Sequence, residues 1–332
     1  MTSLVTGASG FVGSHLVRLL ASRGERVRAL ARRTSDFHAI EDLLPDRVER
    51  IEGDLCDPAS LRAALAGVAQ VFHVAADYRL WSKHPQEIYQ SNVEGTRNLL
   101  EAARSASVER FVYTSTVGTI AVPVPSGLPS EDTAACLDQM VGHYKRSKFL
   151  AEQLALAAAR SGLPVVIVNP TTPVGPGDWK PTPTGKTIVD FLNGRTPAYV
   201  DTGLNIVAVE DVAMGHLLAA ERGRVGERYL LGGENLTLRE IFAALAELSG
   251  LRAPRWKIPH AFALLAGYLD TGLSTLTGRP PRVPLEGVRM ARHRMFADCS
   301  KARCELGFHP GPARDALRRA VEWYQEHGYA AK

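Results

Sequence analysis

The chain has 332 residues, of which 45% are hydrophobic, so it can bury a large core as one big domain or as two fused domains. Its net charge of +4 arises from basic and acidic residues that are mixed along the sequence. No basic run alternates with aromatic residues, which argues against a nucleic-acid partner.

Short apolar runs alternate with helical patterns through the first half of the chain. Strands are expected near residues 3–6, 26–32, 48–54, 70–76, 110–116 and 164–170, and helices near 11–24, 58–67, 91–106 and 143–162. This alternation predicts an α/β fold built on a doubly wound parallel Rossmann sheet.

The pattern changes after Pro170, where TTPVGPGDWKPTPTG is rich in Pro and Gly and predicts a loop that borders a site. A strand and a helix follow in 204–222, then a strand in 228–233, a helix after Leu236 and a last helix in 313–328. We expect residues 1–174 to bind the nucleotide, with 203–234 returning to that domain. Residues 175–202 and 235–332 would form a smaller C-terminal substrate-binding region.

Residues 261–278 are the most apolar stretch, but Asp270 interrupts them, so they are too short to span a membrane. Two interpretations stay open: an ordinary amphipathic helix, or a surface in peripheral contact with a membrane. No secretory signal precedes the first apolar run. The four cysteines lack Cys-x-x-Cys spacing, which argues against a metal site or disulfides and favours a reducing cytoplasm.

Glycines punctuate the segment between the first strand and the first helix, TGASGFVG. Gly7, Gly10 and Gly13 suit a tight turn, close approach of a pyrophosphate and packing of the helix on the strand. The segment therefore predicts a dinucleotide site, and the residues between these glycines that would also contact the cofactor are Ser9, Phe11 and Val12.

The end of the second strand indicates which dinucleotide binds. An acid that accepts hydrogen bonds from the adenosine ribose is usual there in NAD-dependent enzymes, whereas this chain has Ala31 followed by Arg32 and Arg33. Two arginines can bind a 2′-phosphate, so NADP(H) is favoured over NAD(H). The alternative is that both arginines are simply solvated at the surface.

Two further strand ends face the same ligand. Asp54, followed by Leu55, ends the third strand and could accept from the adenine amino group or cap the next helix, a role that Asp57 could equally take. Ala75 and Ala76 end the fourth strand and are small enough for a cofactor to approach, although packing alone also explains them.

Proton-carrying groups gather after the fifth strand. Thr114, Ser115 and Thr116 end that strand, and the next helix carries Tyr144 and Lys148 four residues apart, on one face. Since ligands bind at the C-terminal edge of such sheets, these groups are expected beside the nicotinamide, where Tyr144 exchanges a proton.

These segments together resemble an extended short-chain dehydrogenase/reductase of the NAD-dependent epimerase/dehydratase family. The resemblance runs from TGASGFVG through NVEGT (92–96) and YKRSK (144–148) to DCSKARCELGFHP (298–310). Within that family, NPTTPVGPGDWKPTPTG, PAYVDTGLN and GERYLLGGENLTL are most similar to hopanoid-associated sugar epimerases, which are themselves similar to dihydroflavonol 4-reductases.

The resemblance implies a role for each matching residue. Tyr144 would be the acid/base, Lys148 would hold the nicotinamide ribose and lower the tyrosine pKa, and Thr116 would bind the reacting oxygen. Asn92 would hold backbone or water at the site, unless it only caps a helix, and Pro170 would border the nicotinamide. Ala208 stands where relatives often carry His or Tyr, which weakens the carry-over of a sugar-nucleotide pocket.

Three functions follow as hypotheses. The first is an NADP(H)-dependent reductase that acts on a carbonyl of a small-molecule substrate, lipid-like or sugar, with a link to hopanoid metabolism. The second is an NAD(P)-dependent sugar epimerase or dehydratase, and the third is a non-catalytic NADP(H) sensor. A homodimer is expected, because the helices in 92–106 and 144–162 carry more apolar surface than one sheet face covers.

Overall fold

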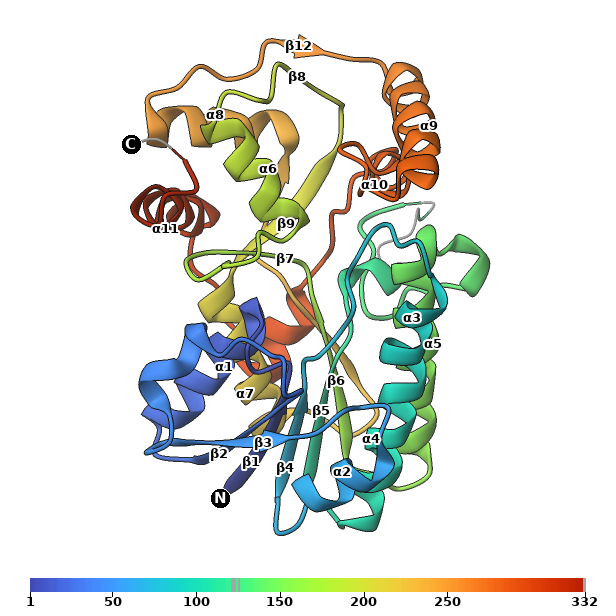
Figure 1. Cartoon of the computed structure of the whole chain (residues 1–332), viewed down its shortest axis with the longest axis vertical. Helices are drawn as coiled ribbons and strands as arrows, with labels where there is room; N and C mark the ends of the chain where they lie inside the picture. Colours follow the sequence, from blue (N-terminus) through green and yellow to red (C-terminus); the bar gives the residue numbers. More distant parts are fainter. Residues whose placement is uncertain (121–123, 125, 331–332) are drawn as a thin grey trace.

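A computed structural model describes residues 1–120, 124 and 126–330, and shows a sheet layer below a smaller upper region (Figure 1). Seven parallel strands form the main sheet in the order β10-β6-β5-β4-β1-β2-β3. They are β1 (Thr2–Thr6), β2 (Arg26–Ala31), β3 (Val48–Glu52), β4 (Gln70–His73), β5 (Arg110–Thr114), β6 (Val165–Pro170) and β10 (Arg228–Leu231). The predicted doubly wound fold is confirmed. The order of the strands reverses between β1 and β4, and such sheets bind ligands at this position.

Helices cover both faces of this sheet (Figure 1). On one face lie α1 (Phe11–Ser22), the 3-10 helix η1 (His38–Leu43) and α7 (Val209–Arg222); on the other lie α2 (Pro58–Ala64), α4 (Gly95–Ser105) and α5 (Gly142–Arg160). Because both faces are covered, the strands read as continuous apolar runs, and every residue of β6 is buried.

The helix expected at 91–106 begins differently. A short α3 (Gln86–Tyr89) continues through a π-helical turn, η2 (Gln90–Glu94), into α4. Such turns often occur at functional sites, and this one carries Asn92.

The upper region contains the smaller sheets. β7 (Thr172–Val174), β9 (Gly203–Ala208) and β11 (Glu234–Thr237) form a mixed three-stranded sheet, and β8 (Ala198–Tyr199) pairs with β12 (Trp256–Lys257). The segment after Pro170 is therefore not wholly a loop, because β7 pairs in parallel with β9. This pairing joins residues distant in sequence, which local composition does not report.

Helices complete the upper region: α6 (Pro183–Leu192), α8 (Leu238–Ser249), α9 (His260–Thr277), α10 (Leu285–Met290) and α11 (Ala313–Glu326). Three short turns lie outside it: η3 (Val117–Thr119) follows β5, η4 (Leu137–Gln139) precedes α5, and η5 (Ala302–Leu306) packs against α7 and β10. α8 begins where predicted, because Thr237 and Glu240 form a reciprocal capping box. The faces of α6, α8 and α11 share one apolar core. None of the helices in the described ranges is both long and apolar enough to cross a membrane.

Candidate active site

The turn between β1 and α1 brings three backbone segments into close contact. Gly7 has a φ of +66°, and a Cβ there would lie 2.7 Å from the Ala75 nitrogen. A Cβ on Gly13 would lie 2.0 Å from the Gly7 carbonyl oxygen. Side chains at these two positions would overlap the neighbouring backbone, so the turn requires glycine.

The first turn of α1 is open to an anion. Gly10 is its N-cap residue, no side chain caps the turn, and no acidic residue lies in it. A helix N-terminus of this kind attracts negative charge through its amide groups. The glycine cradle and the uncapped helix therefore fit the pyrophosphate of a dinucleotide, and the side chains around it belong to Ser9, Phe11 and Val12.

A buried chain of hydrogen bonds fixes the end of β4 beside this turn. The Thr6 hydroxyl accepts from the Ala75 amide at 3.1 Å, and the His73 ring lies 2.8 Å from Thr6 and 2.9 Å from Thr96. Burial, reinforced by the Lys148 charge, lowers the pKa of His73 to about 3, so the ring is neutral. His73 is thus a buried structural residue of the core. The sequence could not predict this hydrogen-bond network, because its members are far apart along the chain.

Asp54 and Leu55 follow β3. Asp57, rather than Asp54, caps α2, since it accepts from the Ala59 amide at 3.0 Å. Asp54 accepts from the Cys56 amide at 2.8 Å and remains half-buried at the strand end. Leu55 packs on α4, where a Cβ on Gly95 would meet its side chain at 2.8 Å.

Arg32 and Arg33 extend from the end of β2 at the exposed surface. The Arg33 carbonyl accepts from Arg50 at 3.0 Å, and among the described residues neither guanidinium of this pair is in an ion pair. No acid follows β2 until Asp36. Both positive charges are therefore available to a phosphate at this edge.

Tyr144 stands in the first turn of α5, half-buried, across from the residues that follow β5. Burial raises the pKa of its hydroxyl, and a hydrogen bond with Thr116 lowers it, while Tyr78 adds a smaller upward shift. Thr116 begins η3 in extended conformation, with its hydroxyl accepting from the Gly118 amide at 3.1 Å. The net effect keeps Tyr144 protonated, as a proton donor must be.

Lys148 lies one turn further along α5 and is 2% exposed. Its Nζ donates to the Thr114 carbonyl at 2.7 Å and lies 4.5 Å from the centroid of the Tyr113 ring. Burial lowers the pKa of Lys148 to about 7, and Glu152 opposes this shift. The family resemblance implies that the Lys148 charge lowers the pKa of Tyr144. In the structure, however, the Lys148 ammonium is directed to the Thr114 carbonyl at the end of β5.

The side chains of the remaining predicted residues near β4, β5 and β6 make few contacts within the site. The Thr114 hydroxyl bonds the His216 ring at 2.8 Å on the far side of the sheet, so only its carbonyl is turned toward Lys148. The Ser115 hydroxyl is buried without a hydrogen-bond partner among the described residues. Ala76 is half-buried after β4, and Pro170 is buried at the end of β6.

Asn92 joins two segments of the site. Its Oδ1 accepts from the Asp77 amide at 2.7 Å, and its Nδ2 donates to the Asp77 carbonyl and to Ser147, both at 2.9 Å. Ser147 in turn donates to the Tyr144 carbonyl at 2.8 Å. Asn92 therefore ties the loop after β4 to the turn of α5 that carries Tyr144, and it does not cap a helix.

A second buried network, missed by sequence reasoning, holds Thr116 from behind. Asn169 Nδ2 donates to the Thr116 carbonyl at 3.1 Å and to Glu152 at 2.9 Å, and Thr119 also donates to Glu152 at 2.9 Å. Arg228 of β10 lies 3.3 Å from the other oxygen of Glu152. The one available signal was the position of Glu152, four residues after Lys148 on the same helix.

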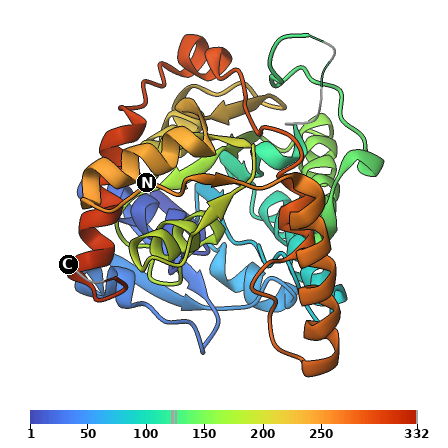
Figure 2. The same ribbon diagram turned by 90° about the horizontal axis from the view of Figure 1, so that it is seen from above.

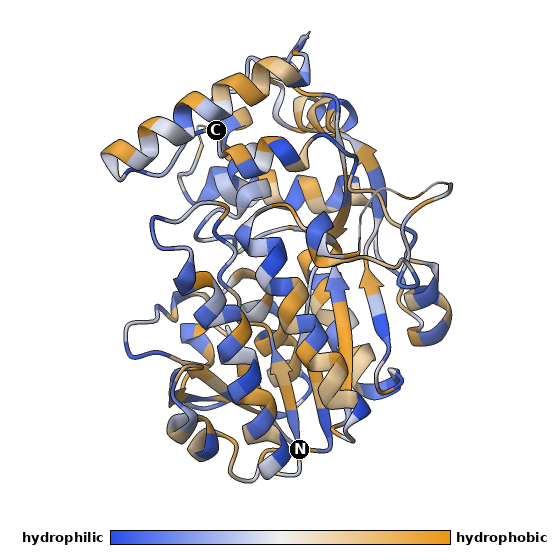
Figure 3. Ribbon diagram, turned by 90° about the vertical axis from the view of Figure 1, so that its right-hand side faces the viewer, coloured by the Kyte–Doolittle hydropathy of each residue, from blue (hydrophilic) through white to orange (hydrophobic). Residues whose placement is uncertain are grey.

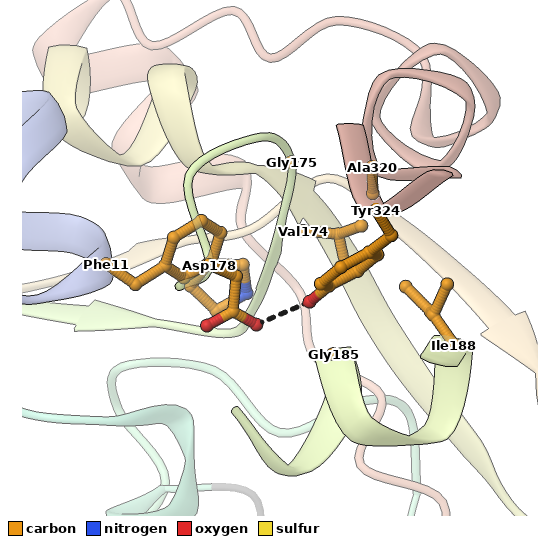
Figure 4. Close-up of a pocket in the computed structure, with 9 residues that line it drawn as sticks. Phe11, Val174, Gly175, Asp178, Gly185, Ile188, Ala320 and Tyr324 are labelled. Carbon is orange, nitrogen blue, oxygen red and sulfur yellow. Dashed lines mark hydrogen bonds between the residues drawn. The ribbon is translucent and has the colours of Figure 1, made fainter. Parts of the chain in front are cut away.

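Asp178 connects the Pro/Gly-rich segment to the C-terminal helix (Figure 4). It accepts from the hydroxyl of Tyr324 at 2.7 Å and from Thr182 at 2.9 Å, and Phe11 of the glycine turn lines the same small pocket. Burial raises the pKa of Asp178, which these hydrogen bonds partly oppose. The segment after β7 is thus held against the cofactor turn, as a border of the site.

Removing the Lys148 charge should stabilise the protein while inactivating it. The pKa of Lys148 is about 7 in the folded chain against an ordinary 10.5, so the unfolded chain binds this proton more tightly, and wild-type stability rises with pH between about 7 and 10.5. We expect Lys148→Met to lose turnover. At pH 7 its free energy of unfolding should exceed that of the wild type by roughly a few kcal/mol, so it should unfold at a higher temperature. Thermal melts should show this gain shrinking toward pH 10.5; equal melting at pH 7 would contradict it.

The strand ends thus bring together the glycine turn that can bind an anion, two exposed arginines, and Tyr144, Thr116 and Lys148. Among the described residues, no group of three or more His, Cys, Asp or Glu is placed to bind a metal. Fold and site define a dinucleotide-binding oxidoreductase of the Rossmann class. The sequence profile of the NAD dependent epimerase/dehydratase family matches residues 3–232, and the chain belongs to that family of extended short-chain dehydrogenases/reductases.

Similar proteins agree with that assignment. A putative dihydroflavonol 4-reductase of Synechocystis is 45% identical over 98% of this chain and 95% of its own length. The sterol demethylase protein B of Methylococcus capsulatus is 40% identical over 99% of both chains. The crystal structure of gox2253 is 46% identical, covers 99% of both chains and superposes with a TM-score of 0.88. The chain is an NAD(P)-dependent enzyme of the reductase type.

Proposed function

We propose that this enzyme is an NADP(H)-dependent reductase of a substrate carbonyl. The observation that carries the proposal is that Thr116 lies beside Tyr144 at the end of β5, close enough to lower the pKa of the Tyr144 hydroxyl. When bound, the nicotinamide exchanges a hydride with the substrate carbon. Tyr144 donates its proton to the oxygen as negative charge develops there, and Thr116 binds the same oxygen. Lys148, which holds the end of β5, would bind the nicotinamide ribose.

The proposed preference for NADP(H) depends on Arg32 and Arg33. Because both guanidiniums are exposed without an ion pair to a described residue, they can bind a 2′-phosphate at little cost. We expect the double variant Arg32→Ala/Arg33→Ala to bind NADPH about 10 to 100 times more weakly and NADH unchanged. Fluorescence titration of the apo protein measures both affinities, and Arg195→Ala, another exposed arginine, is the matched control.

Mass spectrometry of the nucleotide released on denaturation tests the reductase against the epimerase. A reductase exchanges its cofactor in every cycle, so we expect an empty site or dissociable NADP(H) after purification. Tightly retained NAD⁺, or variants that lose NADPH and NADH equally, would contradict the proposal. That result would favour an epimerase, which must hold its cofactor through oxidation and re-reduction of one substrate.

The substrate we propose is a ketone on a lipid-like or polycyclic skeleton, including hopanoids. The support is the likeness to a putative dihydroflavonol 4-reductase and to a sterol demethylase protein, together with Ala208 in place of a sugar-nucleotide pocket residue. Turnover of a panel of sterol, hopanoid and sugar ketones with NADPH would test it. A cytoplasmic location also stays a prediction.

The homodimer stays a prediction as well. In the structure the larger apolar side chains of α5 are half-buried rather than exposed: Phe149, Leu150, Leu154 and Leu156. Leu154 and Leu156 pack against the core on this face of the sheet. The apolar surface that α5 leaves for a partner is thus smaller than the sequence suggested. Sedimentation equilibrium would measure the oligomeric state.

A further inference from the structure

α9 packs with its apolar side outward. The residues it buries are small: Ala263, Gly267 and Ser274. The residues it exposes are large, and they form one stripe at helical spacing, which we call the α9 stripe: Phe262, Leu265, Leu269, Leu273 and Leu276. Leu269 is 68% exposed and Leu276 85% exposed. An amphipathic helix that packs on a core would show the opposite distribution.

Specific contacts with α10 fix this orientation. A Cβ on Gly267 would lie 3.4 Å from Leu285, so the helices approach closely on the small-residue side. His260 contacts the Val288 carbonyl at 2.8 Å, and Thr271 accepts from the Leu285 amide at 3.2 Å. The stripe therefore faces outward because the polar and small residues are already used on the inner side.

The stripe lies at the rim of the molecule. Seen from above, α9 stands at the edge, and its C-terminal end reaches beyond the neighbouring elements (Figure 2). In the side view it is the long helix at the upper left, with many residues coloured as hydrophobic (Figure 3). Contiguous exposed apolar surface of this kind marks an interaction site.

The charged residues in the segment that contains the α9 stripe are almost all basic. Residues 251–283 contain five basic side chains and one acid, Asp270, which accepts from the Val283 amide at 2.7 Å. Lys257 pairs with Asp201, and the four other basic residues lie at the exposed surface. Arg252 and Arg255 lie between α8 and β12, whereas Arg279 and Arg282 follow the C-terminal end of α9. None of these four arginines is in an ion pair with another described residue.

We propose that the α9 stripe docks on the surface of an anionic lipid bilayer. The large apolar residues of the α9 stripe match the acyl boundary of such a bilayer, and Arg279 and Arg282 at the C-terminal end of α9 match its headgroups. The helix would lie in the plane of the bilayer. A second copy of the chain fits less well, because a symmetric contact would bring the arginines of both copies together without acids to pair them.

The helix that carries the docking surface is connected to the active site through α10. Glu286 of α10 accepts from the amide of His143, the residue before Tyr144, at 3.2 Å, and a Cβ on Gly142 would overlap the same carboxylate. If the substrate is lipid-like, which rests on the proposed function, the bilayer would present it next to Tyr144. The docking itself needs no turnover, so its test is independent of the reductase activity.

Vesicle co-sedimentation tests the proposal with the full chain. We expect binding to vesicles of 70% phosphatidylcholine and 30% phosphatidylglycerol, and much weaker binding to pure phosphatidylcholine. Leu265→Ser/Leu269→Ser/Leu273→Ser should weaken binding by at least about tenfold, and Arg279→Gln/Arg282→Gln by about tenfold on the anionic vesicles alone. Val225→Ser, which changes an exposed apolar residue away from α9, should bind as wild type does.

Three results would overturn the proposal. The first is wild-type protein that stays in the supernatant with anionic vesicles, and the second is a serine variant that binds them as wild type does. The third is a serine variant whose sedimentation equilibrium shifts from dimer to monomer, which would show that a second copy covers the stripe. Unchanged melting temperature and NADPH affinity in each variant verify that the fold is intact.

Discussion

Tyr144→Phe is expected to lower kcat by about 10³-fold while leaving NADPH affinity unchanged. The substitution removes only the hydroxyl, whose pKa Thr116 lowers, and keeps the ring at the start of α5. Without this proton donor, charge that develops on the substrate oxygen is not neutralised. Steady-state rates and cofactor titration measure the two effects separately.

The matched control is Tyr268→Phe, which removes an exposed hydroxyl on α9 and should retain full activity. Reduction needs the protonated phenol, and burial raises the pKa of Tyr144, so ionisation of this phenol should lower the wild-type rate only at strongly alkaline pH. Loss of the Lys148 charge, whose pKa is about 7, should lower the rate separately near neutral pH. Unchanged turnover in Tyr144→Phe would refute the proton-transfer role and would reopen the choice of acid.

Gly13→Ala is expected to abolish cofactor binding and to destabilise the protein by about 1–3 kcal/mol or more. Its Cβ would lie 2.0 Å from the Gly7 carbonyl oxygen, which is backbone and cannot rotate away. The turn would have to open, and the cradle for the pyrophosphate would be lost with it. Calorimetry in the presence and absence of NADPH measures both consequences.

Gly272→Ala provides the control for this substitution. No atom lies within 4 Å of the added Cβ, and the residue is exposed within α9. Alanine there should stabilise the helix by up to about 1 kcal/mol, because glycine loses more backbone entropy on folding. A Gly13→Ala protein that melts and binds NADPH as wild type does would disprove the steric account of the turn.

The periodicity of the sequence was sufficient to predict the strands of the main sheet, because the pattern of apolar residues that defines a strand is local. Apolar runs of strand length recur between helical patterns, and each of the six expected strands is present in the sheet. The glycine turn was equally readable, since the need for Gly7 and Gly13 arises within one short segment. Candidates at strand ends could be named for the same reason: the parallel topology places all C-terminal strand ends at one edge.

Only the tertiary structure decided contacts between distant segments. The pairing of β7 with β9, the network that joins Asn169 to Glu152, and the bond between Asp178 and Tyr324 depend on approach in space, for which the sequence carries no local period. It also decided that Lys148 is directed to the Thr114 carbonyl.

The residues of α9 show the same division most clearly. The sequence determined that they form an apolar helix interrupted by Asp270, because composition and spacing are properties of the segment itself. Which side of that helix faces the protein depends on its partner, α10, which contacts the small residues and leaves the large ones exposed. Secondary structure follows from local spacing, whereas exposure is a property of the neighbours that folding supplies.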